Sequence, residues 1–243
     1  MSDRRQVAGS VLLVSEDNSA LEYLAEPMQQ LALSIQTCKE IATATERLNN
    51  NKYEAVVIDL AIGHPALLFL ERVRASASNR GAVTFAITDS DDASARALSL
   101  GFSFVLQRPL TLDTIRDTLK VAYGLIVRER RRYFRYPVVV PVVFNRRANA
   151  VIYGRTINLS ERGMALNCST PLSQGAEGSV QFTLDDPSLR ITADSRVCWS
   201  DEKGNAGLSF LFLPFDMASE LQGWLAQKLE AQLPPQVAER LRR

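Results

Sequence analysis

The amino-acid sequence predicts two domains of different fold class: a doubly wound α/β domain with a five-stranded parallel sheet, then six antiparallel strands in a β-barrel or sandwich with a closing carboxy-terminal helix. Up to about residue 124, short apolar runs alternate with longer amphipathic stretches, which is typical of a parallel sheet covered by helices on both faces. After Arg128 the chain changes to short apolar segments separated by Gly, Pro, Asn, Asp and Ser, which is typical of a small barrel or sandwich. The length of 243 residues leaves room for both domains.

Five strands and five helices alternate in the predicted first domain. The strands are apolar runs at residues 10–14, 33–38, 53–59, 82–88 and 102–106. The helices are amphipathic and cover residues 18–31, 43–51, 65–75, 91–100 and 111–126. Asn18 is the expected N-cap of the first helix, Pro65 opens the third, and Gly101 ends the fourth.

Six short strands are expected in the second domain, each bounded by turn-forming residues. They lie at residues 137–144, 150–158, 163–169, 178–184, 190–199 and 206–213. A last amphipathic helix follows in "MASELQGWLAQKLEAQ", with an apolar stripe at Met217, Leu221, Trp224, Leu225 and Leu229. We expect this stripe to cap the barrel, and residues 233–243 to form a flexible tail.

Composition narrows the class of protein and its compartment. The formal net charge is +1, so the overall charge gives no argument for nucleic acid as a partner. Cys38, Cys168 and Cys198 are scattered without CxxC spacing, which favours reduced thiols over a disulfide framework or a zinc site. The sequence has no signal peptide and no run of about 20 apolar residues, so we expect a cytoplasmic protein without a membrane span.

The sequence does not favour an enzyme. His64 is the only histidine, which leaves little general-base chemistry near neutral pH. No Ser-His-Asp, Cys-His or paired-carboxylate arrangement occurs in the sequence. We therefore expect no catalytic residue, no metal site and no cofactor.

Residues 10–124 resemble a response-regulator receiver domain. The resemblance rests on "VLLVSEDNSALEYL", "AVVIDL", "FAITDS" and "LQRPL", which follow the order and spacing of that family. It implies that Ser15 and Glu16 occupy the positions of a metal-binding acid pair, and Asp59 that of the phosphoacceptor. Thr88 and Arg108 fall at the positions of the family's hydroxyl and lysine.

Two of these positions depart from the receiver pattern. Ser15 removes one carboxylate from the metal site, although magnesium usually requires carboxylates together with phosphate oxygens. Arg108 is longer and planar, so it does not replace a lysine conservatively. We therefore predict a pseudo-receiver used for homodimerisation or partner docking. A phosphorelay output protein, regulated by phosphorylation at Asp59, is the alternative.

The segment "RERRRYFRYP" carries five arginines within eight residues, and residues 125–136 are the expected arginine-rich linker. Guanidinium groups such as those of Arg131 and Arg135 match phosphate oxygens bidentately, and they also match the O6/N7 edge of guanine. A second polar group follows in "TINLSERGMAL". There Asn158 can accept a guanine N–H, Ser160 can donate to a phosphate, and Gly163 permits a close approach.

The two groups together, RxxxR followed by [D/N]xSxxG, resemble the PilZ domain over residues 129–232. The resemblance implies an effector that binds cyclic di-guanylate (cyclic di-GMP), which carries two phosphates and two guanines. It implies that Arg131 and Arg135 clamp the ligand, while the barrel side of the site is formed by Asn158, Ser160 and Gly163.

Three further residues are weaker candidates for the ligand site. The resemblance implies that an additional arginine before RxxxR, here Arg130, favours a stacked pair of ligand molecules. Arg132 can also reach the ligand, and Trp199 can either stack on a base or pack in the barrel.

The linker suggests a mechanism. Its charges repel and it lacks apolar anchors, so we expect it to be mobile until the ligand phosphates order it against the barrel. This ordering would change the geometry between the domains and signal to an unidentified protein in motility, adhesion or exopolysaccharide control. A nucleic-acid binder that uses the basic linker is a rival, but the only other basic run is the short "RLRR" end.

Overall fold

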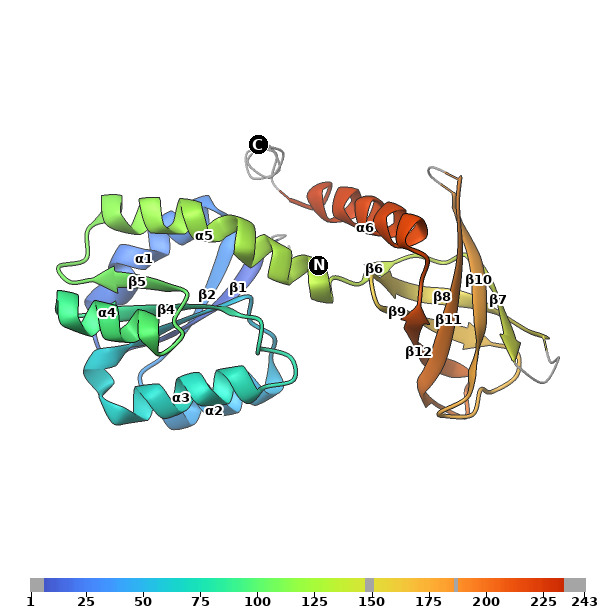
Figure 1. Ribbon diagram of the computed structural model, residues 1–243, viewed down its shortest axis with the longest axis horizontal. Helices are drawn as coiled ribbons and strands as arrows, with labels where there is room; N and C mark the ends of the chain where they lie inside the picture. The colour runs from blue at the N-terminus through green and yellow to red at the C-terminus, as the bar shows by residue number, and fades with distance from the viewer. Residues whose placement is uncertain (1–6, 147–150, 186–187, 234–243) are drawn as a thin grey trace, which may run out of the picture. The chain divides into compact units, whose positions relative to one another are not determined.

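The computed structural model describes residues 7–146, 151–185 and 188–233. The chain divides into two compact units (Figure 1). The first unit comprises Met1–Arg130 together with Gln232–Arg243, and the second comprises Arg131–Ala231. Of the tail predicted at residues 233–243, only Leu233 is described, and it is buried in the core of the first unit.

The first unit contains a five-stranded, fully parallel sheet in the order β2-β1-β3-β4-β5. The strands are β1 (Gly9–Val14), β2 (Leu33–Cys38), β3 (Ala55–Asp59), β4 (Val83–Thr88) and β5 (Phe104–Gln107). This is the doubly wound order in which a ligand or phosphoryl site lies beyond the carboxyl ends of β1 and β3. The predicted fold class of the first half is confirmed.

Helices cover both faces of this sheet. They are α1 (Asn18–Gln30), α2 (Ile41–Asn50), η1 (Leu60–Ile62), α3 (His64–Ala75), α4 (Asp91–Ser99) and α5 (Leu112–Tyr133). Figure 1 shows α1 and α5 on one side of the sheet and α2 and α3 on the other, and a separate apolar cluster fills each layer. The Ser19 amide donates to Asp17 Oδ1 over 2.8 Å, so Asp17, and not the predicted Asn18, caps α1.

Helix α5 runs further than the sequence analysis expected. It ends at Tyr133, so residues 125–133 of the expected linker are helical. Ile126, Val127 and Glu129 are buried and continue the inward-facing stripe of the helix. Arginine has a high helix propensity, and cations are favourable at a helix C-terminus. These two effects, together with the buried stripe, outweigh the charge repulsion that favoured a loop.

The second unit is a closed antiparallel barrel. Its strands are β6 (Tyr136–Pro137), β7 (Pro141–Arg146), β8 (Val151–Ser160), β9 (Gly163–Cys168), β10 (Glu177–Asp185), β11 (Ser188–Ser200) and β12 (Asn205–Phe212). The order is β6-β8-β7-β10-β11-β12-β9, and an additional pairing of β9 with β8 closes a ring of six strands. The short β6 lies outside this ring, on β8. The predicted six-stranded barrel is confirmed.

Helix α6 (Phe215–Glu230) closes the second unit. It begins two residues before the predicted stripe, and Met217 packs against the barrel core while Leu221, Trp224, Leu225 and Leu229 are buried in it. None of the helices in the described part of the chain combines the length and apolar character that crossing a membrane requires.

Candidate anion-binding site

The strand β6 brings the arginine segment to β8. Tyr136 pairs with Leu159, and Pro137 pairs with Asn158. Arg135, the residue before β6, consequently reaches the signature strand, and its Nη1 donates to Asn158 Oδ1 over 3.2 Å. Two groups that lie 23 residues apart in the chain, and that the sequence analysis assigned to one ligand, are therefore in contact.

A β-bulge turns Asn158 outward. Thr156 pairs with Leu166 and Asn158 with Ala165, so Ile157 is the extra residue on β8. Thr156 and Leu159 are three positions apart, so strict alternation would place them on opposite faces of the strand, yet both are buried, at 1% and 0% exposure. The bulge shifts the alternation and leaves Asn158 on the outer face of the barrel.

Ser160 and Gly163 hold the turn that follows β8. The Ser160 hydroxyl is 5% exposed and donates to the Gly163 carbonyl over 2.9 Å, across the turn that joins β8 to β9. A Cβ on Gly163 would collide with the Leu208 carbonyl of β12, so only glycine fits. In this structure both residues stabilise the turn beside Asn158, and the hydroxyl is already engaged.

Arg131 contacts a carboxylate at the end of α6. Its Nη2 lies 3.2 Å from Glu230 Oε1 at the end of α6, and its side chain is 30% exposed. Its Nε is buried without a hydrogen-bond partner among the described residues. The guanidinium of Arg131 is therefore only partly engaged, and it has the capacity to bind an oxyanion.

Glu161 adds a second acidic group near these arginines. Desolvation raises the pKa of the Glu161 carboxyl, while the charges of Arg162, Arg131 and Arg132 act in the opposite direction. The turn Ser160–Gly163 is thus within the electrostatic reach of Arg131 and Arg132. The sequence analysis did not identify Glu161 or Glu230 as counter-charges, although a glutamate inside the signature turn is a visible signal.

Two of the three aromatic residues among the arginines are anchors in the barrel. Phe134 is 8% exposed and belongs to the apolar core of the second unit. Tyr136 packs against this core, with its ring edge-on to Trp224 at a centroid distance of 5.4 Å. The expectation that the linker lacks apolar anchors is wrong, because Phe134 and Tyr136 pack into the second unit, whereas Arg132, Tyr133 and Arg135 are exposed.

Trp199 lies in the same cross-strand row as Asn158. The row runs from Asn158 through Ala165 and Gly207 to Trp199. Every second residue of β11 is buried up to Val197, but the register shifts at Cys198. Trp199 is therefore 48% exposed instead of buried. Its indole lies where a Cβ on Gly207 would point. Three strand spacings, about 14 Å, separate it from Asn158 on the outer face of the barrel.

The position of the receiver phosphoacceptor holds an internal ion pair. Asp59 is 2% exposed at the end of β3, and it accepts hydrogen bonds from Ser15 Oγ at 2.6 Å and from Arg108 Nη2 at 2.8 Å. Arg108 also contacts Asp17 at 3.2 Å and Asp89 at 3.4 Å. The guanidinium therefore occupies the space between the carboxylates that face this edge of the sheet.

These contacts determine the charge state of Asp59. Desolvation would raise its pKa, but hydrogen bonds from Arg108, Ser15 and the Ala61 amide, with the charge of Arg108, leave the pKa below its ordinary value. The hydrogen bond with Asp59 is likewise the largest effect on Arg108, and it raises the pKa of that guanidinium. Both groups stay charged near neutral pH.

The other two receiver positions are not at this pair. Glu16 is exposed, and Asp17 supplies the carboxylate that the sequence analysis expected from Glu16. Thr88 is 1% exposed, and its hydroxyl lies 2.8 Å from Ser94 Oγ. Among the described residues, no group of three or more His, Cys, Asp or Glu side chains is placed to hold a metal ion.

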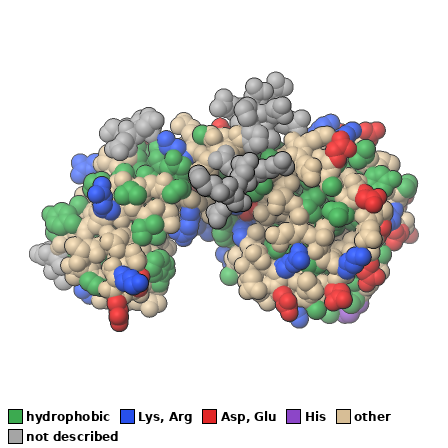
Figure 2. All heavy atoms as spheres, turned by 180° about the vertical axis from the view of Figure 1, so that it is seen from behind, with side chains coloured by type: hydrophobic (Ala, Val, Ile, Leu, Met, Phe, Trp, Pro, Cys, Tyr) green, Lys and Arg blue, Asp and Glu red, His purple; other side chains and the backbone are tan. Residues whose placement is uncertain are grey.

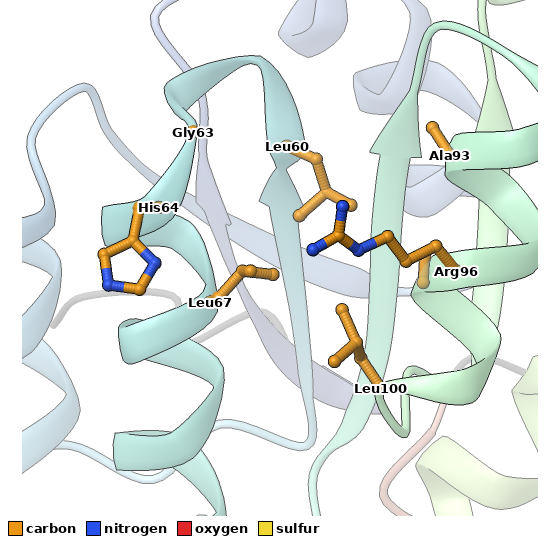
Figure 3. A pocket seen from close by; sticks show the side chains of 8 residues that line it. Leu60, Gly63, His64, Leu67, Ala93, Arg96 and Leu100 are labelled. Atoms are coloured by element: carbon orange, nitrogen blue, oxygen red, sulfur yellow. The ribbon is translucent and has the colours of Figure 1, made fainter.

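A pocket of about 340 Å³ opens between α3 and α4 of the first unit (Figure 3). Its lining is mostly apolar and consists of Leu60, Gly63, His64, Leu67, Ala93, Arg96, Ala97 and Leu100. Figure 3 shows the Arg96 side chain extending from α4 toward Leu60. None of the lining residues is an acid, so the pocket offers no carboxylate for acid–base chemistry beside His64.

Comparison with known proteins gives one family and several similar folds. Residues 129–227 match the family model of the PilZ domain. Comparison with curated proteins gave no significant match.

Among solved structures, the chemotaxis response regulator CheY4 of Vibrio cholerae is 16% identical, with a TM-score of 0.42, and the match covers 46% of this chain and 96% of that one. A signal receiver domain from Colwellia psychrerythraea 34H is 21% identical, with a TM-score of 0.42 and coverage of 47% and 97%. The PilZ domain of CeSA, from a cellulose-synthesizing bacterium, is 17% identical, with a TM-score of 0.32 and coverage of 39% and 97%.

The family match begins at residue 129 and covers Arg131 and Arg135, all strands of the barrel, and most of α6. It therefore includes both sequence groups that the strand β6 brings into contact. Residues 129–227 of this chain are a PilZ domain, carried behind a receiver-like α/β unit.

Proposed function

We propose that this protein is a cyclic di-GMP receptor and that its PilZ domain acts as an effector rather than as an enzyme. The contact between Arg135 and Asn158 is the observation that carries the proposal. It places a guanidinium and an amide side by side on the outer face of a barrel, which suits a ligand that carries both phosphate and guanine. Arg131 adds a second guanidinium, which contacts the Glu230 carboxylate.

When the ligand binds, the arginines have to give up their contacts with carboxylates and form contacts with phosphates. Arg131 would leave Glu230 and bind a phosphate oxygen, and Glu161 would no longer face the arginines alone. Each charge-assisted hydrogen bond contributes about 1.5–3 kcal/mol where water is partly excluded. Several such bonds reach the roughly 8 kcal/mol of a micromolar complex.

The end of α5 is the element we expect to change. Arg131 lies in the last turn, where the Phe134 amide donates to the Arg131 carbonyl over 3.2 Å. A helix C-terminus carries about half a negative charge, which repels a phosphate. Because this segment is already helical, we propose that ligand binding unwinds the last turn of α5, and not that it orders a mobile linker. The freed segment and α6 would then present a changed surface to a partner protein.

The receiver-like unit fits a role without phosphorylation. Arg108 already neutralises Asp59, and Ser15 supplies a hydroxyl where a carboxylate would help to hold magnesium. We propose that this unit is a docking or dimerisation module. The ion pair between Arg108 and Asp59 speaks against the alternative of a phosphorelay protein, because it occupies the carboxylate that would accept the phosphoryl group.

A nucleic-acid role finds less support. Within the arginine segment Phe134 is buried and Tyr136 packs against the barrel core, which leaves Tyr133, at 40% exposure, as the aromatic side chain that could stack on a base there. Figure 2 shows acidic and basic side chains interspersed on the visible face of the receiver-like unit, without a basic stripe. The arginines of the PilZ domain suit a small ligand better than a long backbone.

Calorimetry with cyclic di-GMP at moderate salt tests the proposal. We expect micromolar binding that falls at least about tenfold in Arg131→Ala and in Arg135→Ala, since each variant removes one or more charge-assisted bonds. Trp199→Ala should lose about 1 kcal/mol if its indole stacks on a base. Arg190→Ala, an exposed arginine elsewhere on β11, is the matched control and should bind like wild type.

Two results would overturn the proposal. The first is an absence of binding at concentrations of tens of micromolar. The second is tight binding of single-stranded oligonucleotides with a steep salt dependence, which would instead indicate counterion release along a phosphate backbone.

A further inference from the structure

The pocket between α3 and α4 exists because small residues leave a hollow between larger ones. Ala93 and Ala97 lie four residues apart on α4 and share one face, and Gly63, just before α3, has open space where a Cβ would point. Figure 3 shows Leu67 of α3 and Leu100, at the end of α4, on either side of this hollow. The volume of about 340 Å³ lies at the lower end of the range of small-molecule sites.

Arg96 of α4 brings a guanidinium to this pocket that no other side chain engages. Its side chain reaches from α4 toward Leu60 (Figure 3). Asp92 lies four residues earlier on the same helix, where an acid and an arginine commonly pair, yet the Arg96 guanidinium forms no ion pair or hydrogen bond with any residue that the structure describes. Arg74 of α3, by contrast, donates to four acceptors. The donors of Arg96 are therefore available to a ligand.

One guanidinium beside an apolar lining defines the chemistry of the ligand. Leu60 and Leu67 are half-buried and Leu100 is 44% exposed, so an apolar body could cover them and exclude water. A guanidinium matches the two oxygens of a carboxylate bidentately, and His64 offers a ring N–H from the α3 side of the lining. A space of this size is far too small for the roughly 800 Å² that each partner buries in a typical protein interface. The pocket therefore suits a small molecule with one carboxylate.

We propose that the pocket between α3 and α4 binds a small organic monocarboxylate with an apolar body, such as an arylalkanoate, and that Arg96 holds its carboxylate. The carboxylate would lie at the exposed Arg96 side chain, and the apolar body would cover the leucines of the lining. All lining residues belong to the first unit, so the site is complete within that unit. The inference does not depend on the cyclic di-GMP site.

The pocket adjoins two of the positions that the receiver resemblance singles out. Leu60 directly follows Asp59, whose carboxylate caps η1. Ser94 follows Ala93 on α4, and its hydroxyl lies 2.8 Å from that of Thr88. An occupant that contacts Leu60 and Ala93 therefore stabilises the segments on both sides of this edge of the sheet. Binding of a small carboxylate would give the receiver-like unit an input that requires no phosphoryl transfer.

Titration of the full chain with 4-phenylbutyrate, followed by NMR of labelled leucine and alanine methyl groups, tests the site. We expect saturable shifts at the methyl groups of the lining, with a dissociation constant on the order of 0.1–1 mM. The neutral 4-phenylbutyramide should bind at least about fivefold more weakly, because it forms no charge-assisted pair with Arg96. Arg96→Gln should bind the acid and the amide equally. Ala93→Leu should weaken both at least about tenfold, because the added side chain fills the hollow.

Arg72→Gln on α3 and Ala95→Leu on α4 are the matched controls. They make the same chemical changes at exposed positions outside the lining, and both should bind the acid like wild type. The inference is overturned if about 10 mM acid produces no saturable shift, or if the shifts centre on residues outside the lining. Equal affinity of wild type for acid and amide, or an Arg96→Gln variant that binds the acid like wild type, overturns it as well.

Discussion

The two units each contain an arginine site, and the sites differ in how completely carboxylates neutralise them. In the receiver-like unit, Arg108 lies within 3.4 Å of three carboxylates, one of them buried. In the PilZ domain, Arg131 contacts the carboxylate of Glu230, and Arg135 contacts a neutral amide. A guanidinium surrounded by internal acids has little capacity left for an external anion, whereas an under-neutralised one retains it.

This difference shows which unit is suited to respond to an anionic ligand. Both regions resemble phosphate-handling families in sequence, and both keep positive charge at the expected place. The acids around each arginine decide whether that charge is available. In the receiver-like unit the carboxylates of the unit itself neutralise Arg108, whereas Arg131 and Arg135 of the PilZ domain keep hydrogen-bond donors for an external anion.

Removing each arginine should give the largest contrast between the two sites. Arg108→Ala leaves Asp59 buried without its counter-charge and should lower the free energy of unfolding of the first unit by about 3–5 kcal/mol. Arg131→Ala removes a partly exposed pair and should cost about 1 kcal/mol or less. Urea titration followed by circular dichroism, with the two units fitted as separate transitions, measures both. An equal loss of unfolding free energy in the two variants would contradict the proposed difference between the two arginine sites.

Acid should weaken the closed site through Asp59. Its pKa in the folded protein lies below the ordinary value of 3.8, so protonation favours the unfolded chain. The stabilisation is fully present above about pH 4 and is lost as the pH falls through the folded-state pKa. Thermal unfolding of wild type and Asp59→Asn between about pH 5 and pH 2 measures it. The asparagine variant should show the shallower dependence, and parallel curves would refute this role of Asp59.

We expect the smallest effect from a small-molecule phosphodonor, which should not phosphorylate Asp59. Acetyl phosphate with magnesium should leave the mass of the intact protein unchanged, because Arg108 and Ser15 occupy both sides of Asp59. A receiver domain with an intact acid pair serves as the positive control. An Asp59-dependent phosphoryl adduct on the wild-type chain would show that the ion pair opens, and would revive the phosphorelay alternative.

The fold was predictable to within a few residues wherever turn chemistry marks the ends of elements. Gly101, for example, has φ +94° just beyond α4, as expected of a helix stop. The end of α5 was not predictable in this way. A run of arginines suggests repulsion and a loop, but the helix is extended by the burial of Ile126 and Glu129 against the first unit. Only the tertiary structure supplies that burial.

The sequence predicts the basic residues of the candidate site, but not the acidic residues that contact them. The RxxxR pattern and Asn158 are visible in the sequence, but their acidic partners are distant in the chain. Glu230 carries no local signal, and its role depends on which carboxylate the fold places beside Arg131. The same reason explains why Asp17, rather than its neighbour Glu16, faces Arg108.

The bulge at Ile157 has a consequence for how such barrels can change over time. Deleting one residue there would restore strict alternation on β8, so that the amide now facing Arg135 would point into the barrel interior. A single-codon deletion would thus remove the contact between Arg135 and Asn158 while leaving the strand order of the barrel intact. In related barrels, the number of residues in this strand would then decide, together with the polar side chains themselves, whether the asparagine faces the arginine.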